Sequence, residues 1–309
     1  MRRIATLTLN PSIDVAYEFA ELRPTVKIRC SEERYAPGGG GLNVARVLAR
    51  FGHRASCYYL SGGRTGATLD RLLLHAGLER RPLPITGDTR VCFNSLETGT
   101  GLEYRFVPKG PEVSAAEWQT CLHAVETTRC DYLVASGSLP RGVPVDFYAR
   151  LAALARARGF RLVLDTSGEA LRAGLAEGGV YLVKPSETEI AALAGEEIAD
   201  LDAYAAAAEA VVADGQAELV ALTLGPRGGI LASSDGTEFV PVPQVEARSA
   251  VGAGDSTVAG MVHRLATGAE PLAAFRFGLA AGTAAVLTPG TDMCRPEDVE
   301  RIYREMGGS

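Results

Sequence analysis

The chain has 309 residues, 47% of them hydrophobic and 22% charged, which is ordinary for a globular protein with room for a sizeable core. Its 31 basic and 37 acidic residues give a net charge of −6, which argues against non-specific nucleic-acid binding but permits a local basic pocket. No apolar run reaches membrane-spanning length. The length allows one large domain or two small ones, of which we expect one over 1–309, in a cytoplasmic protein with neither nucleic acid nor membrane as partner.

The first residues, MRRIATLTLNPSIDVAYEF, alternate in polarity and lack the continuous apolar stretch and cleavage site of a signal peptide. This pattern predicts a first strand. Six cysteines are scattered without a C-x-x-C pair, and four histidines lie outside any close Cys/His spacing. We expect free thiols in a reducing compartment and no zinc site.

Two segments, 13–36 and 88–107, resemble strands with hairpin turns and interrupt an otherwise alternating strand–helix pattern. They are either two β-excursions at a sheet edge or one small sheet that stands over the site as a lid. A lid sheet would have an exposed face that a second subunit could cover.

Four consecutive glycines, Gly38 to Gly41, precede a helical pattern in YAPGGGGLNVARVLARFG. Glycines let a ligand approach the main chain, and a helix N-terminus offers free N–H groups to an anion or a hydroxyl. A flexible loop is the plainer interpretation, but Asn43 follows where its side chain could reach back into the loop. The spacing is not that of the dinucleotide-binding fingerprint, which disfavours a dehydrogenase.

From about residue 130 onward, short apolar strands alternate with helical segments that end in glycine. This alternation predicts an α/β protein with a parallel sheet covered on both faces. Ligands of such sheets bind beyond the carboxyl ends of the strands, so the polar residues there are the first candidates. Ser136 and Ser138, at one strand end, are suited to sugar hydroxyls or phosphate, although a plain turn explains them too.

The segment LVKPSETEIAALAG leaves a strand with Lys184 and enters a helix. Glu187 and Glu189 could reach a Mg²⁺ ion, but Ser186-x-x-Glu189 is also a capping box, which the spacing alone favours. The glycines of ALTLGPRGGILAS (221–233) suit nucleotide phosphates, an adenine edge, or an ordinary β-turn.

In RSAVGAGDSTVAGM (248–261), Gly252 and Gly254 open a helix and would aim their N–H groups at an incoming anion. Asp255 could accept the proton of an attacking hydroxyl, as phosphoryl transfer requires. Taken alone, capping of the helix by Asp255 is an equally good explanation.

Four cationic residues lie on the two β-excursions: Lys27, Arg29, Arg90 and Arg105. Strand alternation would put Lys27 and Arg29 on one face. They are either solvated surface or a grip on a phosphate that the substrate already carries.

The motifs PGGGGLNVARVLARFG and VGAGDSTVAGM resemble the two signatures of the ribokinase-like (PfkB-type) sugar kinases, and SGSLPRGVP, LDTSGEAL, LVKPSETE and TLGPRGG follow in that family's order over the whole chain. The segments TLTLNPSIDVAY, KIRC, DTR and YRFVPKGP are similar to its phosphosugar branch. Within that branch, GGGGLNVAR, YRFV, TSGEAL and FGLAAGTAA are most similar to the minor bacterial 6-phosphofructokinases.

The resemblance implies a ribokinase-like three-layer αβα sandwich with a mostly parallel central sheet and a small β-sheet lid, formed by 13–36 and 88–107. It implies ATP-dependent phosphorylation of fructose 6-phosphate at O1. The implied cofactors are ATP and Mg²⁺, with K⁺ as a further candidate, and the implied partner is a second copy of the chain, joined through the lid.

By position, the resemblance makes Asp255 the catalytic base and Gly252, Ala253 and Gly254 the anion hole. It assigns to substrate binding Asp14, Lys27 (from the partner's lid), Gly38, Gly39, Asn43, Arg90, Arg105 and Ser138. It assigns to nucleotide binding Lys184, Ser186, Thr223, Gly225 and Gly228, and to the Mg²⁺–water shell Glu189.

Three positions depart from the family pattern. Ser186 stands for an asparagine of the metal motif, Asp292 for an arginine near a monovalent-cation loop, and Arg23 for a lid tyrosine. The minor 6-phosphofructokinases can bind a second, inhibitory ATP. Because Arg23 replaces their lid tyrosine, the resemblance does not carry this inhibition over to the present chain. Fructose 1-phosphate and tagatose 6-phosphate remain alternative substrates. A free-sugar kinase would leave the basic lid residues without a partner, and a non-catalytic sensing module would not need Asp255.

Overall fold

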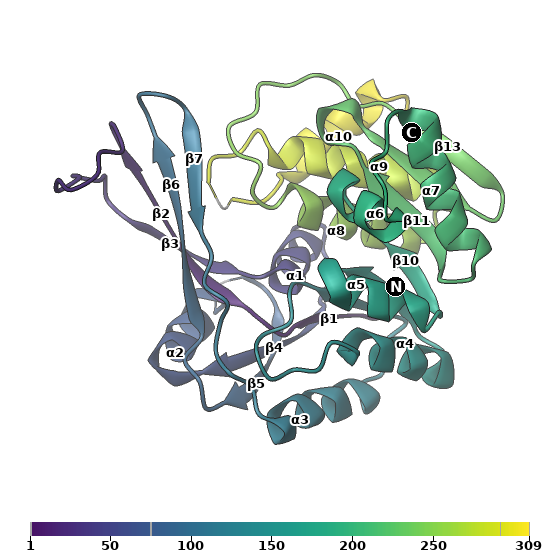
Figure 1. The fold of residues 1–309 in the computed structure, drawn as a ribbon, viewed down its shortest axis with the longest axis horizontal. Coiled ribbons are helices and arrows are strands. Elements are labelled where there is room, and N and C mark those ends of the chain that lie inside the picture. Colours follow the sequence, from purple (N-terminus) through teal and green to yellow (C-terminus); the bar gives the residue numbers. More distant parts are fainter. Residues whose placement is uncertain (1, 75, 291, 309) are drawn as a thin grey trace.

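The computed structural model describes residues 2–74, 76–290 and 292–308, which form a large sheet between two layers of helices and a second, smaller sheet (Figure 1). The large sheet has the strand order β13-β12-β11-β10-β9-β8-β1-β4-β5. The strands of this sheet run in one direction, except for β12, which runs antiparallel to β11 and β13. The strands are β1 (Ile4–Thr8), β4 (Ser56–Gly62), β5 (Glu79–Ile85), β8 (Tyr132–Ser136), β9 (Arg161–Asp165), β10 (Val180–Val183), β11 (Ala217–Thr223), β12 (Gly229–Ser233) and β13 (Gly236–Val240).

One hydrophobic core lies on each face of this sheet. The first is covered by α1 (Gly40–Arg50), α2 (Gly63–Leu72), α8 (Ala253–Ala266), α9 (Pro271–Ala285) and α10 (Pro296–Glu305). The second is covered by α3 (Ala115–Glu126), α4 (Phe147–Arg158), α5 (Gly168–Ala176), α6 (Glu187–Ala194) and α7 (Leu201–Ala213). These layers confirm the predicted αβα sandwich with a mostly parallel sheet. Within the described part of the chain, we find no helix that combines the length and the apolar character needed to cross a membrane.

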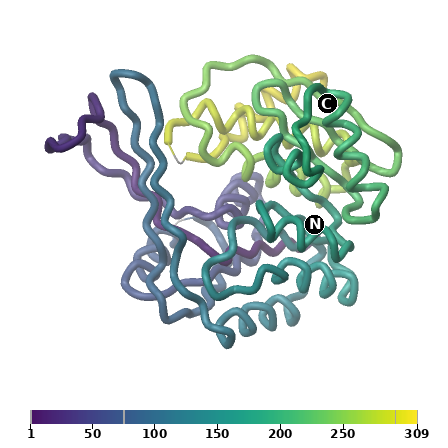
Figure 2. The backbone as a smooth tube through the Cα atoms, viewed as in Figure 1, coloured from purple at the N-terminus to yellow at the C-terminus, as the bar shows by residue number. Residues whose placement is uncertain are grey.

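The small sheet joins both N-terminal excursions in the order β3-β2-β6-β7, which confirms the prediction of one sheet rather than two separate edges. Its strands are β2 (Ser12–Phe19), β3 (Arg34–Gly38), β6 (Arg90–Glu97) and β7 (Leu102–Phe106). Figure 2 shows these early segments of the chain rising together beside the main body.

The segment between β2 and β3 differs from its prediction. It turns at Pro24 and at Thr25, whose φ is 64°, and it forms no strand around Lys27 and Arg29. Strand alternation therefore does not apply to these two residues, and the prediction that it puts them on one face is wrong.

The two faces of the small sheet differ in character. Register places Tyr35, Val15, Phe93 and Phe106 in one row across all four strands, and Val15 is buried while the three aromatic residues are exposed. The opposite face carries Asp14, Cys92, Asn94 and Arg105. One face is thus aromatic and the other polar.

Helices α8 and α9 pack closely because glycines face one another between them. A Cβ on Gly260 would lie 2.9 Å from the Ala281 Cβ and 3.0 Å from the Gly278 Cα. A Cβ on Gly278 would lie 2.5 Å from the Met261 Cγ and 2.7 Å from the Thr257 carbonyl oxygen. Since α8 begins at the predicted active-site motif, this packing holds that motif in place.

We expect Gly278→Ala to lower the free energy of unfolding by about 1–3 kcal/mol, because its methyl group overpacks against a backbone oxygen that has no room to move. Alanine by itself favours a helix by about 1 kcal/mol over glycine, so the two effects have opposite signs. Denaturant unfolding measures the difference, with an unchanged m-value as control. A variant more stable than the parent would contradict the close packing.

Candidate active site

The N-terminus of α8 lies between two cavities. One, of about 280 Å³, is lined by Asp255 and Gly252 together with residues from the small sheet and the start of α1. The other, of about 370 Å³, is lined by Ala253 and Gly254 together with the β11–β12 turn. The first is mainly polar in its residues, whereas the second has apolar walls that include Val242, Val245 and Leu279. We call them the polar cavity and the apolar cavity.

Asp255 lies in the first turn of α8 but does not cap it, since Gly252 is the N-cap and makes no side-chain cap bond. Its Oδ2 instead accepts a hydrogen bond of 2.9 Å from the amide of Asn43 on α1. Burial raises the pKa of Asp255 to about 6, and the Asp165 carboxylate adds to this, while the Asn43 bond and Lys184 oppose it. The geometry therefore favours a proton acceptor over the capping role that the sequence left open.

A buried ion pair lies beside Asp255. The Nζ of Lys184 is 3.2 Å from Oδ1 of Asp165, and both side chains are largely buried. Burial lowers the pKa of Lys184, but the Asp165 and Glu189 carboxylates outweigh it and leave that pKa raised. Lys184 is thus a fixed positive charge, and a Cβ on Gly254 would lie 3.5 Å from its Nζ.

Two positions around Asp255 require glycine, each for a different steric reason. Gly252 has a φ of 78°, and a Cβ there would lie 2.6 Å from the Met293 Cε. A Cβ on Gly40 would lie 2.0 Å from the Ser136 Oγ and 3.0 Å from Oδ1 of Asp255. A side chain at either position would collide with the site, so the motifs need glycine there.

Two of the three N–H groups predicted for the anion hole make no internal hydrogen bond in the described residues. The N–H groups of Gly252 and Gly254 have no hydrogen-bond partner in the described part of the chain, whereas that of Ala253 lies 3.5 Å from the Ala250 oxygen. Ser256 already closes the first helical bond, to the Gly252 oxygen. Two predicted donors are therefore available at the boundary between the cavities.

The polar cavity brings together most of the predicted substrate residues. It is lined by Asp14, Gly39, Asn43, Arg90, Arg105 and Ser138, and also by Glu189. Gly38 lies behind this wall, where a Cβ would collide with the Asp14 carboxylate. Burial raises the pKa of Asp14, while a bond from Ser12 and the nearby Arg105, Arg90 and Arg46 lower it.

Arg90 is held in place before any ligand binds, because its guanidinium donates to the main-chain oxygens of Pro108 (3.0 Å) and Asn10 (2.8 Å). An adjoining depression adds Lys109 and Arg141 to the positive charge of this end. These two residues lie within the motifs YRFVPKGP and SGSLPRGVP, but neither was predicted as a site residue, because a charge in a turn has an ordinary surface explanation.

The nucleotide candidates lie mainly along the apolar cavity, which is lined by Thr223, Gly225 and Gly228. Ser186 bridges to Thr223 between the strand ends. The capping box predicted for Ser186 and Glu189 is present, with Oε2 of Glu189 accepting from the Ser186 N–H at 2.8 Å. Oε1 of Glu189 accepts no hydrogen bond within the described part of the chain.

Two further predictions concern segments that line neither cavity. Lys27 is exposed and lines neither of them. The loop expected near a monovalent cation includes Thr291, which lies outside the described residues, and its Asp292 carboxylate accepts a 3.0 Å bond from Arg50.

Sequence reasoning also missed Asp165 and Arg46. Asp165 is the last residue of β9, in a segment singled out only as a motif, and the strand-end rule is the signal that points to it. No sequence signal distinguishes Arg46 from other charges on a helix.

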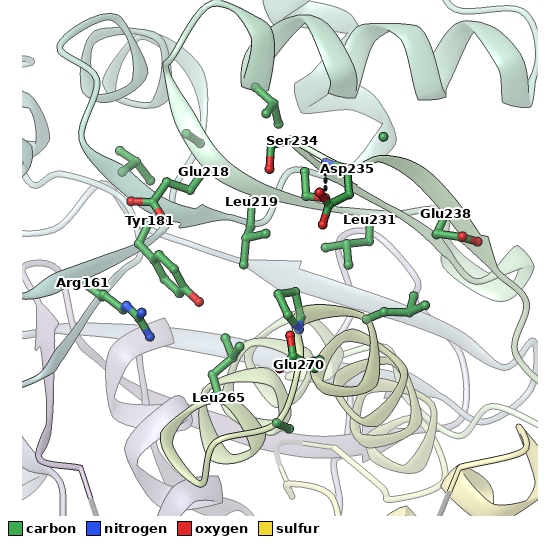
Figure 3. A pocket seen from close by; sticks show the side chains of 18 of the residues that line it. Arg161, Tyr181, Glu218, Leu219, Leu231, Ser234, Asp235, Glu238, Leu265 and Glu270 are labelled. Carbon is green, nitrogen blue, oxygen red and sulfur yellow. Dashed lines mark hydrogen bonds between the residues drawn. The ribbon is translucent and has the colours of Figure 1, made fainter.

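A further cavity, of about 1000 Å³, lies at the opposite edge of the sheet (Figure 3). Tyr181, Leu219 and Leu265 line it, with Arg161 at one side. No residue predicted for the site lines it.

Comparisons with known proteins identify the family of this chain. The family model described as "pfkB family carbohydrate kinase" matches residues 7–298. The ATP-dependent 6-phosphofructokinase isozyme 2 of Mycobacterium tuberculosis is 40% identical over 304 residues, covering 97% of this chain and 89% of that protein.

Among solved structures, phosphofructokinase-2 of Escherichia coli in complex with potassium superposes with a TM-score of 0.95 at 38% identity, covering 99% of this chain and 100% of that one. The same enzyme in complex with fructose-6-phosphate gives a TM-score of 0.94 at 37% identity, with the same coverage. Arabidopsis thaliana ribokinase, at 18% identity over 98% of this chain and 99% of that one, shares the fold with a TM-score of 0.77. This protein belongs to the pfkB family of carbohydrate kinases.

Proposed function

We propose that this protein transfers the γ-phosphoryl group of ATP to O1 of fructose 6-phosphate and releases fructose 1,6-bisphosphate. One observation carries the proposal: a polar cavity and an apolar cavity meet at the N-terminus of α8, where Asp255 stands. The acceptor and the donor would enter from opposite sides of that point. The names of the relatives agree with this chemistry.

Asp255 removes the proton of the attacking hydroxyl. Its Oδ2 is held by Asn43, and Oδ1 is the oxygen nearer Gly40, at the wall of the polar cavity. As the hydroxyl oxygen attacks the γ-phosphorus, the bond to the β-phosphate oxygen breaks and the proton passes to the carboxylate. The free N–H groups of Gly252 and Gly254 and the charge of Lys184 then stabilise the transferring group.

The carbohydrate binds in the polar cavity, with hydroxyls at Asp14, Gly39 and Asn43. Its phosphate lies toward Arg90, Arg105 and Ser138, where the guanidinium groups suit bidentate binding. The adenine ring lies against the apolar walls of the other cavity, beside Gly225 and Gly228.

The residues present fit a magnesium ion bound together with the nucleotide. Mg²⁺ usually takes one or two carboxylates, several waters and phosphate oxygens, and Glu189 has one carboxylate oxygen free for it. A bound Mg²⁺ would neutralise charge on the nucleotide phosphates, with Glu189 as the carboxylate that would hold it. Because Ser186 replaces the asparagine of the family motif, Glu189 carries this contact together with its capping role. Potassium enters none of these steps.

We also propose that the small sheet is a lid and that two copies of the chain associate through it. Its outer face exposes Tyr35, Phe93, Leu102 and Phe106, a group that an isolated chain would leave in water. In the pair, Lys27 of each chain would complete the phosphate site of the other, which explains why it lines no cavity of its own chain.

The substrate assignment is tested by a coupled assay of ATP-dependent turnover on fructose 6-phosphate, fructose 1-phosphate, tagatose 6-phosphate, fructose and ribose. We expect the highest kcat/KM on fructose 6-phosphate, because the basic end of the polar cavity suits a phosphate. A preference for either other phosphosugar would retain the mechanism and change the substrate. Turnover of only the free sugars would refute the phosphosugar assignment.

In the same assay, the Asp255→Asn variant tests the role of Asp255 as the base. Loss of one catalytic base typically costs about 10²–10⁴-fold in turnover. We expect a loss of this size with nearly unchanged ATP affinity, measured by calorimetry with a non-hydrolysable analogue. Normal turnover would remove Asp255 from the mechanism.

The base also predicts a pH dependence. Since Asp255 must be ionised and its pKa is about 6, kcat/KM should fall below pH 6 by about tenfold per pH unit. The substrate phosphate titrates nearby, so Asp165→Asn serves as the control. Removing that carboxylate lowers the pKa of Asp255 and should move the acid limb to lower pH, which titration of the substrate alone would not do.

The shared site is tested by mixing two inactive variants. If Lys27 acts across the interface, a dimer of Lys27→Ala with Asp255→Asn contains one complete site out of two. Random pairing of equal amounts should then restore about a quarter of the parent activity. Activity that stays at the level of the separate variants, after light scattering has shown exchanged dimers, would place Lys27 outside the partner's site.

A further inference from the structure

Arg46 forms a hydrogen-bonded chain that ends at the candidate base. It lies three residues after Asn43 on α1, so both side chains lie on the same face of the helix. Its Nη1 donates to the amide oxygen of Asn43 and to the main-chain oxygen of Pro37, both at 3.1 Å. Asn43 in turn donates to Oδ2 of Asp255 at 2.9 Å.

The chemistry of the two neighbours decides which way the Asn43 amide points. A guanidinium has only donors, so the amide must turn its oxygen toward Arg46. An ionised carboxylate has only acceptors, so the amide must turn its NH₂ group toward Asp255. With Arg46 in place, both requirements select the same orientation. Without Arg46, only the carboxylate would select it.

The same guanidinium connects this chain to the small sheet. Pro37 lies in β3 and pairs with Ile13 of β2, next to Asp14 in the polar cavity. Arg46 is half-buried at the junction of α1 and β3, where Asp14 and Asp255 both act on its charge. A displacement of β3 would therefore move Arg46 and, through Asn43, the base.

We propose that Arg46 is a positioning residue: it holds the amide of Asn43 in the orientation that fixes Asp255, and it makes that orientation depend on the place of β3 in the small sheet. The inference rests on the proposed function, in which Asp255 is the base. It assigns a role to a residue that contacts neither cavity and neither reactant.

The test compares Arg46→Met and Arg46→Lys with the parent enzyme. We expect Arg46→Met to lower kcat by about 10- to 100-fold, the usual effect of a misplaced catalytic group, with the KM for ATP changed less than threefold. The acid limb of the pH profile should move to higher pH, because Asn43 no longer holds the ionised form of Asp255. Arg46→Lys can still donate to both oxygens and should recover most of the turnover.

Several charges face Asp255 and must be kept in view when that profile is interpreted. They are Asp165 from β9, Lys184 after β10 and Asp14 from β2. Loss of the Arg46 charge alone would also raise the pKa of Asp255. A double-mutant cycle with Asn43→Ala separates the two causes, since a pure charge effect persists without Asn43.

If Arg46 acts through Asn43, adding Arg46→Met to Asn43→Ala should change kcat less than twofold. Effects that multiply in the double variant would overturn the inference, as would an Arg46→Met enzyme with normal kcat and pH profile. Should Arg46→Met fail to fold, Arg46→Gln is compared with the parent enzyme in its place. The glutamine side chain can still donate to one oxygen. Normal turnover of Asp255→Asn would instead refute the proposed function. An inactive Asp255→Asn beside a normal Arg46→Met would refute only the role of Arg46.

Discussion

The arrangement of the site depends on one buried carboxylate that must still be able to ionise. Burial and the neighbouring Asp165 both disfavour the charge on Asp255, while Asn43 and Lys184 favour it, and its pKa is about 6 as a result. A carboxylate with an ordinary pKa would be a weaker base, and loss of Asn43 or Lys184 would raise the pKa of Asp255 further. The groups around Asp255 come from α1, β9 and the end of β10, so the fold as a whole sets this balance.

The two glycines of the VGAGDS motif answer to different constraints. Gly252 is required by the protein itself, since its φ is positive and Met293 occupies the place of a Cβ. Gly254 has an ordinary φ, and a Cβ there would make only a normal contact with Lys184. Its smallness therefore leaves space beside the main chain on the side of the apolar cavity. One glycine of the motif is thus required by the backbone geometry, whereas the other keeps space free beside the apolar cavity.

Sequence periodicity predicted the strands β8 to β11 and the layers around them, because buried parallel strands are short apolar runs with clear breaks. The strand-end rule likewise brought Ser138, Lys184 and Thr223 to one edge of the sheet. It did not reveal what Asn43 contacts, since its partner lies 212 residues away. The rule points to the position of Asp165 but not to its pairing with Lys184, and it says nothing of Arg46, because a charge on a helix has many ordinary explanations. The segment around Lys27 misled the pattern because Pro24 and Thr25 turn the chain where alternating residues suggested a strand.

The two β-excursions form one small sheet whose two faces differ, so one face can serve the site while the other is free for an interface. Successive residues of a strand point to opposite faces, so Asp14 and Val15, or Cys92 and Phe93, necessarily separate polar from apolar side chains. The polar face lines the cavity that ends at Asp255, and the aromatic face remains exposed. A contact that covers the aromatic face would restrain β3, and β3 holds Arg46 through the Pro37 oxygen. Any association at the outer face would therefore act on the orientation of Asp255 through β3 and the Arg46 guanidinium.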